Sequence, residues 1–241
     1  MRALHQDVTV VVESDVHLES PFWLVNVSNV NITGALVGRP QVHCVQEGAG
    51  FLLLRVRRFN LANLVIQNCT MEYNISGESY HFAMLISESS DFVLRMVRFE
   101  NCSQTALLLA NNAAEARIEN STFANSKFLQ LVGQKYTLYS GAINILEKST
   151  DSAKIVNYLI DYTLFCGNNV STVIKIPTST EKLGFDKRGY GGGVFVEFSG
   201  NTTNSTVTIS HSNFTKNEAV RGGGVYAYYA QKASGNSINI T

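Results

Sequence analysis

The stretch Val207–Val225 reads V-T-I-S-H-S-N-F-T-K-N-E-A-V-R-G-G-G-V. It places apolar residues at Val207 and Ile209 and then, after four further residues, a phenylalanine at Phe214. Three glycines follow and lead into an apolar segment that begins at Val225. Apolar residues with a period of two are typical of a strand with one buried face, and glycines are typical of a tight corner. The stretch therefore predicts short strands joined by sharp turns.

The same spacing recurs along the chain. Six copies align as Val25/Val27/Ile32, Phe59/Leu61/Ile66, Phe92/Leu94/Phe99, Ala116/Ile118/Phe123, Tyr158/Ile160/Phe165 and Val207/Ile209/Phe214. All 18 of these positions are apolar, whereas the composition alone predicts about eight. A small residue opens a short apolar segment after each copy, as Gly50-Phe51-Leu52, Ala83-Met84-Leu85, Ala106-Leu107-Leu108, Gly141-Ala142-Ile143, Gly193-Val194-Phe195 and Gly224-Val225-Tyr226. The chain is therefore expected to be a repeat protein.

The length of the repeat decides the architecture. The third residues of successive copies are separated by 34, 33, 24, 42 and 49 residues, and most of the extra length follows this position, as in Lys127–Ser140 and Val170–Gly189. A unit of 24 residues cannot close a core alone, but stacked units can. The sequence predicts an all-β, single-stranded parallel β-helix of about seven to nine coils with a rise of about 4.8 Å per coil. One internal column is expected to contain Ile32, Ile66, Phe99, Phe123, Phe165 and Phe214.

Two of the copies resemble a known family. Phe165–Asn168 with Gly191–Val194, and Phe214–Asn217 with Gly222–Val225, resemble the F-x-x-N and G-G-[AGILV] repeats of chlamydial polymorphic outer-membrane proteins. More broadly, the repeats resemble the right-handed parallel (pectin-lyase-like) β-helices of many uncharacterised eukaryotic extracellular proteins. The resemblance runs from about residue 20 to the end of the chain. The resemblance implies a right-handed β-helix with an adhesive or surface role. It does not identify a specific activity.

The last residue of the F-x-x-N motif is expected at a corner of each coil. Asn168 and Asn217 would stack there as a ladder of hydrogen-bonded amides. Cys69 and Cys102 occupy this position in two other copies. One coil apart, their Cα atoms would lie near 4.8 Å, within the disulfide range of roughly 4.4 to 6.8 Å. A Cys69–Cys102 disulfide is therefore expected, with an unlinked pair of stacked thiols as the alternative.

Several classes of function are excluded. The chain has 19 basic and 19 acidic residues, a balance that argues against nucleic-acid binding. The glycines of Gly191–Gly193 and Gly222–Gly224 precede strand-like segments, so we interpret them as corners that need a positive φ, not as phosphate loops or RGG boxes. Apolar stretches such as Ala106–Ala110 are far shorter than the roughly 20 residues of a transmembrane helix. The cysteines and histidines have no metal-ligand spacing, so neither a metal nor a cofactor is expected: Cys44, Cys69, Cys102, Cys166, His5, His17, His43, His81 and His211.

Catalytic candidates are few. The signatures of polygalacturonase-like enzymes are absent, because the chain has no Asp-Asp pair and no His-Gly pair. Glu119 and Asp161 share one repeat position, and two carboxylates about 5 to 9.5 Å apart are what glycoside hydrolysis requires. If the chain is an enzyme, these two residues are the catalytic candidates.

Glycosylation sequons are abundant. Asn-X-Ser/Thr occurs at Asn26, Asn31, Asn68, Asn74, Asn101, Asn120, Asn169, Asn201, Asn204, Asn213 and Asn239. These are 11 sequons, whereas 22 asparagines and the Ser and Thr content of this chain would give about four by chance. The excess predicts an extracellular or cell-surface glycoprotein. The alternative is that Asn, Ser and Thr are enriched in turns and form sequons by accident.

The two ends shape the expected domain organisation. No apolar segment of seven or more residues follows Met1, so this segment contains no signal peptide. Ile238 and Ile240 match the first two positions of a seventh copy, and Thr241 ends the chain before the third. We expect residues 1–241 to form one β-helix domain of a longer secreted or membrane-anchored protein, truncated at both ends, whose uncapped coils associate end to end. The alternative is a natural chain whose ends are covered by a partner.

Three classes of function remain. The first is a non-enzymatic extracellular scaffold or adhesion module that presents Lys127–Ser140 and Val170–Gly189 from one corner to glycans or cell-surface proteins. The second is a carbohydrate-active enzyme, either a polysaccharide lyase or a glycoside hydrolase. The third is an intracellular repeat protein without glycans.

Overall fold

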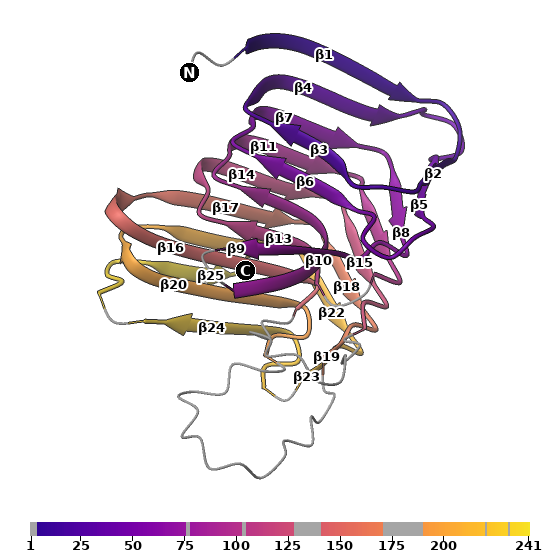
Figure 1. The fold of residues 1–241 in the computed structure, drawn as a ribbon. Coiled ribbons are helices and arrows are strands. Elements are labelled where there is room, and N and C mark those ends of the chain that lie inside the picture. Colours follow the sequence, from indigo (N-terminus) through magenta and orange to yellow (C-terminus); the bar gives the residue numbers. More distant parts are fainter. Residues whose placement is uncertain are drawn as a thin grey trace, which may run out of the picture.

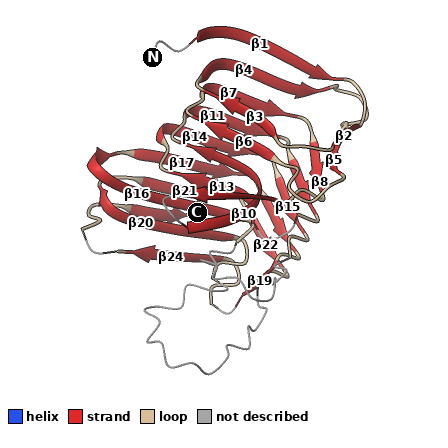
Figure 2. Ribbon diagram, in the orientation of Figure 1, coloured by secondary structure: helices blue, strands red, loops and turns tan. Residues whose placement is uncertain are grey.

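The computed structural model is built from strands (Figures 1 and 2). It describes residues 4–75, 78–102, 105–127, 141–170, 190–219, 221–230 and 232–241. No helix occurs among these residues. The chain winds from β1 (Leu4–Val12), at the top of Figure 1, downwards through successive coils.

Three sheets form the walls of the coil. Sheet A contains β1, β4 (Val27–Gly34), β7 (Arg57–Ala62), β11 (Ser90–Arg95), β14 (Ala113–Glu119), β17 (Val156–Asp161), β21 (Thr206–Ser210) and β25 (Ser237–Ile240). Sheet B contains β2 (Val16–Leu18), β5 (Gln41–Cys44), β8 (Val65–Gln67), β12 (Arg98–Glu100), β15 (Thr122–Ala124), β18 (Leu164–Cys166) and β22 (Asn213–Thr215). Sheet C contains β3 (Phe22–Val25), β6 (Phe51–Leu54), β10 (Glu78–Ser87), β13 (Thr105–Ala110), β16 (Ile143–Lys154), β20 (Val194–Thr202) and β24 (Val225–Tyr229). A short fourth sheet pairs β19 (Asn169–Val170) with β23 (Glu218–Ala219).

Each strand pairs in parallel with the equivalent strand of the next coil. Seven coils of the described chain contribute a strand to all three sheets, and β25 begins an eighth. The predicted parallel β-helix and its number of coils are therefore confirmed. The structure also contains one element that was not predicted. β9 (Met71–Ile75) forms an antiparallel hairpin with β10. The hairpin packs its apolar side chains on the outer face of sheet C, which makes a second, smaller core outside the coil.

The internal column is confirmed for five of its six predicted members. Ile66, Phe99, Phe123, Phe165 and Phe214 are register partners in sheet B. The four phenylalanine rings stack with centroids 5.1, 5.3 and 4.6 Å apart. Such a column buries a large apolar surface along the axis of the coil.

The placement of Ile32 in that column is wrong. Ile32 lies in sheet A, where it pairs with Leu61, and Val42 is the residue that pairs with Ile66. The reason is an insertion, residues 35–40, between sheets A and B of this coil. In the other copies the spacing between the sheet A and sheet B positions is constant and the extra length falls at other corners, so a fixed spacing misaligned only this first copy.

The triple glycines satisfy two different steric demands. Gly191 and Gly222 have φ of 67° and 63°, as predicted for corners. A Cβ on Gly192 or Gly193 would instead lie 2.5 or 2.7 Å from a carbonyl oxygen of the next coil. In the first triple, the second and third glycines therefore permit the close approach of successive coils.

Candidate functional site

Side chains at the corner after sheet B satisfy the backbone of neighbouring coils. Asn168 accepts a hydrogen bond from the backbone N–H of Ser126 at 3.0 Å and donates to the carbonyl of Phe123 at 3.0 Å. Its Nδ2 also donates to Oδ1 of Asn217 at 2.8 Å, so the predicted amide ladder is confirmed. Asn168 is fully buried, and removing its amide would leave backbone groups without partners. This motif is structural.

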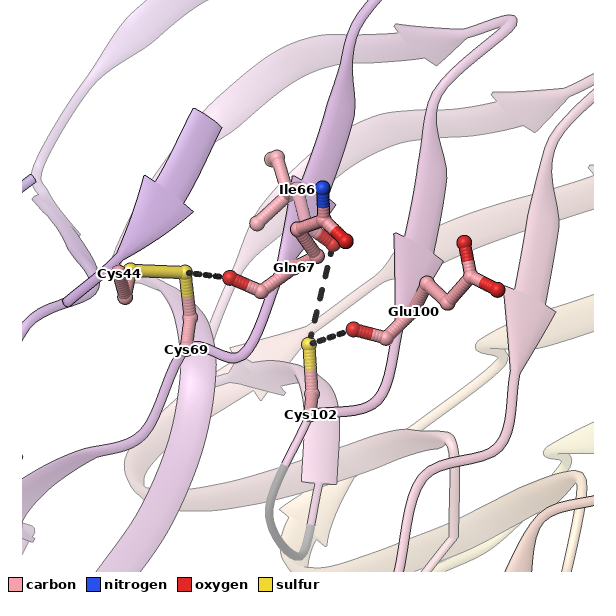
Figure 3. The surroundings of a disulfide bond; sticks show 6 residues. All are labelled: Cys44, Ile66, Gln67, Cys69, Glu100 and Cys102. Carbon is pink, nitrogen blue, oxygen red and sulfur yellow. Dashed lines mark hydrogen bonds between the residues drawn. A yellow bond between two sulfur atoms is a disulfide. The ribbon is translucent and has the colours of Figure 1, made fainter. Parts of the chain in front are cut away.

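The cysteines continue the same corner, but their predicted pairing is wrong. The disulfide joins Cys44 and Cys69, whose Cα atoms are 4.9 Å apart (Figure 3). Cys102 stands on the other side of Cys69 as a buried free thiol, and its Sγ lies 4.0 Å from the carbonyl oxygen of Ile66. Burial raises the pKa of the Cys102 thiol to about 12. A neutral thiol of this kind is a poor nucleophile, which makes Cys102 a packing residue.

The catalytic candidates Glu119 and Asp161 lie side by side. They are register partners at the ends of β14 and β17, on the outer face of sheet A. Oε2 of Glu119 lies 3.6 Å from Nε of Arg95. Oδ1 of Asp161 accepts a hydrogen bond from the Ser210 hydroxyl at 2.7 Å and lies 3.0 Å from Nδ1 of His211. The two carboxylates therefore stand on adjacent rungs, each with a partner of its own.

The charge state of Asp161 restricts its chemistry. Hydrogen bonds from His211 and Ser210 lower the pKa of the Asp161 carboxyl below its usual value. A glycosidase needs one carboxyl group with a raised pKa as its general acid, so Asp161 is suited to charge stabilisation or nucleophilic attack and not to proton donation. Within the described part of the chain, no group of three His, Cys, Asp or Glu side chains could hold a metal ion.

A small cavity lies elsewhere on the molecule. It has a volume of about 20 Å³ and is lined by Ile75, Tyr80, Ala110, Asn111, Leu146 and Lys148, beside the β9–β10 hairpin. This volume holds about one water molecule. The cavity is thus too small for a saccharide, and its lining does not include the carboxylate pair.

An exposed aromatic pair adjoins Asp161. The rings of Tyr162 and His211 stack with centroids 4.6 Å apart and an interplanar angle of 7°. Tyr162 is 58% exposed, and the His211 side chain is 62% exposed. From the sequence, His211 was considered only as a metal ligand, so this pair was not predicted. The sequence did contain a signal for this pair. Asp161 and Ser210 occupy the same repeat position, and Tyr162 and His211 are the residues that directly follow them.

A buried carboxylate was also missed. Glu147 is 2% exposed, accepts a hydrogen bond from the Tyr158 hydroxyl, and accepts another from the backbone N–H of Asn112 at 3.3 Å. In other coils a serine or asparagine on the following coil accepts this corner N–H, as Ser205 does for Val156. Because the next coil places the apolar Val156 at this position, Glu147 supplies the acceptor. Burial and the Glu147 charge raise the pKa of the Tyr158 hydroxyl. Glu147 therefore has a structural role, as the acceptor for two buried donors.

The asparagines that begin sequons are more exposed than the other asparagines of the chain. Nine are exposed, namely Asn26, Asn68, Asn74, Asn101, Asn120, Asn201, Asn204, Asn213 and Asn239, while Asn31 and Asn169 are half-buried. The other eleven asparagines include four buried ones: Asn63, Asn112, Asn144 and Asn168. Every buried asparagine thus lacks a sequon.

The two predicted loops leave from one corner. Lys127 and Asn169, which stand at the beginning of Lys127–Ser140 and just before Val170–Gly189, form a parallel bridge on neighbouring coils. Asn169 begins β19, in the short sheet beside the Asn168 ladder. Residues 128–140 and 171–189 themselves lie outside the described residues.

Comparison with known proteins agrees with this fold. Residues 55–160 match the family described as "right handed beta helix region". No curated protein and no solved structure matches the chain. In the residues that the structure describes, no helix is long and apolar enough to cross a membrane. The chain is a right-handed parallel β-helix repeat protein, and the narrower resemblance to the chlamydial proteins stays a prediction.

Proposed function

We propose that this chain is a non-enzymatic scaffold or adhesion module on the outside of the cell. N-glycans cover its outer surface, and the loops 127–140 and 170–189 are presented from one corner to glycans or cell-surface proteins. The observation that carries the proposal is the sorting of asparagines, since none of the 11 sequons falls on a buried position whereas four of the other 11 asparagines are buried. Glycan acceptors must be accessible on the surface of a secreted chain.

Corner geometry alone does not explain this sorting. Nine asparagines have a positive φ, a conformation that asparagine tolerates better than most residues. Five of them begin sequons and four do not, namely Asn29, Asn63, Asn111 and Asn125. Left-handed corners therefore account for five of the 11 sequon asparagines, and they do not account for the Ser or Thr two residues later.

The disulfide supports the same compartment. Disulfides form and persist in secreted and extracellular proteins and are rare in the reducing cytosol. Cys44 and Cys69 are held one coil apart by the parallel pairing of β5 and β8, which places their Cα atoms 4.9 Å apart. A reducing compartment would leave this pair as thiols.

Expression in a secreting eukaryotic cell tests the proposal. With a signal peptide supplied in front of residue 1, we expect secreted protein whose mass falls by several glycans after treatment with an N-glycosidase. Peptide mapping should find occupied sites among the exposed sequons. Secreted, folded protein without any glycan would contradict the proposal.

Exchange of the corner segments tests the binding role. Replacing residues 128–140 and 171–189 together by Gly/Ser linkers should abolish binding on a glycan array or to cells, while the β-sheet circular dichroism stays unchanged. Each single replacement measures what that loop contributes. Binding that survives both replacements would contradict presentation from this corner.

A carbohydrate-active enzyme is the second candidate, favoured by the adjacent carboxylates of Glu119 and Asp161. An enzyme of this kind should release reducing ends or unsaturated products from acidic polysaccharides. Turnover that is lost in both Glu119→Gln and Asp161→Asn would establish the enzyme and overturn the scaffold. Absence of turnover with intact binding would support the scaffold.

A further inference from the structure

The corner after sheet A forms a regular column of residues. Asn63, Met96, Asn120, Tyr162 and His211, which we name the sheet A corner column, have φ of 55°, 52°, 49°, 47° and 46°. The backbone N–H of each of the five donates to a carbonyl of the next coil, for example Asn120 to Asp161 at 3.1 Å and Tyr162 to Ser210 at 3.2 Å. Because the conformation repeats at a spacing of about 4.8 Å, the side chains leave the column in the same direction.

The stacking of Tyr162 on His211 shows this shared direction. Both rings are more exposed than covered, and they contribute to neither apolar core of the described chain. A left-handed position favours asparagine or glycine, so the backbone gives no reason for a tyrosine here. The pair instead presents aromatic surface to the outside of the molecule.

Asn120 stands one rung from this pair. It is exposed, it begins the sequon Asn120-Ser121-Thr122, and Tyr162 is its neighbour on the following coil. Met96 is its neighbour on the preceding coil. A sugar attached to Nδ2 of Asn120 would therefore emerge between a thioether and an aromatic ring.

We propose that the first N-acetylglucosamine of a glycan on Asn120 docks on the Tyr162–His211 pair and fastens the glycan to the outer surface of sheet A. A β-linked N-acetylglucosamine carries all its axial C–H bonds on two flat faces, and the ring face of an aromatic residue attracts such weakly positive hydrogens. The proposal rests on the proposed function, because it requires a glycosylated chain.

A second sequon provides a matched control. Asn101 is exposed and left-handed, with φ of 53°, but its neighbours at the corner after sheet B are Asn68 and Asn125. No aromatic ring adjoins it in that column. A glycan on Asn101 should therefore remain free of the protein surface.

The experiment compares glycosylated protein with protein from bacteria. The variants are Asn120→Gln, Asn101→Gln, Tyr162→Asn and the double variant Asn120→Gln/Tyr162→Asn. Tyr162→Asn removes the ring, suits the left-handed corner, and creates no new sequon because Leu164 stands two residues later. We expect Asn120→Gln to lower the Tm of the glycosylated protein by about 2–4 °C relative to the same change in bacterial protein. Asn101→Gln should show no such difference.

A spectroscopic readout reports the contact itself. In glycosylated protein, ring currents should shift the acetamide methyl proton signal of the Asn120 sugar upfield, and Tyr162→Asn should return it to the position seen for the Asn101 sugar. The Tm effect of Asn120→Gln should also vanish when Tyr162 is already Asn. An unshifted methyl signal, or an unoccupied Asn120 on a chain with other glycans, would overturn this inference and leave the proposed function standing.

Two further outcomes distinguish an attached glycan from a free saccharide, and this inference from the proposed function. Binding of free chitobiose to the pair in Asn120→Gln protein, without a contact in the glycosylated protein, would overturn docking of the attached glycan. A chain that is secreted without any glycan would overturn the proposed function and this inference together.

Discussion

In the C-terminal coils, the corner after sheet B holds Asn168 and Asn217, whereas in the N-terminal coils the same corner holds Cys44, Cys69 and Cys102. Each amide hydrogen-bonds to the backbone of the preceding coil, Asn168 at Ser126 and Phe123 and Asn217 in the same way one coil later. The cysteines link two coils covalently, and the third thiol points at the Ile66 carbonyl as the Asn168 amide points at that of Phe123. The same corner backbone therefore accommodates either an asparagine amide or a cysteine. Its requirement is an inward-pointing side chain that links successive coils.

The internal column differs between the same two regions. In the C-terminal half it consists of stacked phenylalanines, while the first three coils hold Val16, Val42 and Ile66. In this column, aromatic rings fill the C-terminal coils. The smaller aliphatic residues lie in the N-terminal coils, two of which the disulfide crosslinks. The difference suggests that the N-terminal half relies on the disulfide and the C-terminal half on packing and amides.

The largest effect is expected from Phe123→Ala. Phe123 is fully buried between Phe99 and Phe165, so its loss removes two ring contacts and leaves a cavity. The free energy of unfolding should fall by about 3–5 kcal/mol, whereas Ile66→Val in the N-terminal half should cost about 0.5–1.5 kcal/mol. Urea unfolding measures both, and equal losses would contradict the proposed division between the halves.

Most of this fold could be predicted because its signal is periodic. A strand with one buried face repeats its apolar pattern at fixed positions, so five copies aligned correctly, and the pairing of Ile238 with Val207 confirms the start of a further copy. Fixed spacing fails where the coil length changes at another corner, as at residues 35–40. It also placed Gly141 one position too early, since Ile143 is the partner of Leu107 and Ala142 is therefore the small residue.

The second prediction removes the covalent link. The double variant Cys44→Ala/Cys69→Ala opens a disulfide with a sequence separation of 25 and avoids new pairing with Cys102. A loop of that length predicts a loss of about 3 kcal/mol, because the unfolded chain regains its freedom. Thermal unfolding with and without reductant measures it. The wild type should approach the variant when reduced, and a variant as stable as oxidised wild type would contradict the structural role.

The third prediction concerns the amide ladder. Asn168→Ala leaves the N–H of Ser126 without its acceptor in a buried corner and removes one hydrogen bond to the carbonyl of Phe123, at a cost of about 2 kcal/mol. Asn157→Ala, at an exposed position of β17, is the control and should change stability by less than about 0.5 kcal/mol. Similar values for the two variants would show that the ladder does not stabilise the corner.

The candidate site was less predictable than the fold. The register of Glu119 with Asp161 followed from the repeat, but their partners did not, because Arg95 and His211 come from different coils. The disulfide was misassigned for a related reason, since the misaligned first copy hid Cys44 from its corner. Contacts between coils depend on the exact register, which short motifs determine only where the spacing is constant.

The smallest effect is a dependence of stability on pH at the Asp161 corner. Hydrogen bonds from His211 and Ser210 lower the pKa of Asp161 in the folded chain below its unfolded value. Its contribution is therefore complete above about pH 4 and is lost as the pH falls through the lowered pKa of the folded state. The pair with His211 is solvent-exposed, so the contribution should be less than about 1 kcal/mol and should weaken in high salt. Thermal unfolding of wild type and Asp161→Asn between pH 7 and pH 2 measures it. The two curves should differ at neutral pH and converge in acid, and a constant difference across this range would show that the carboxylate charge does not stabilise the corner.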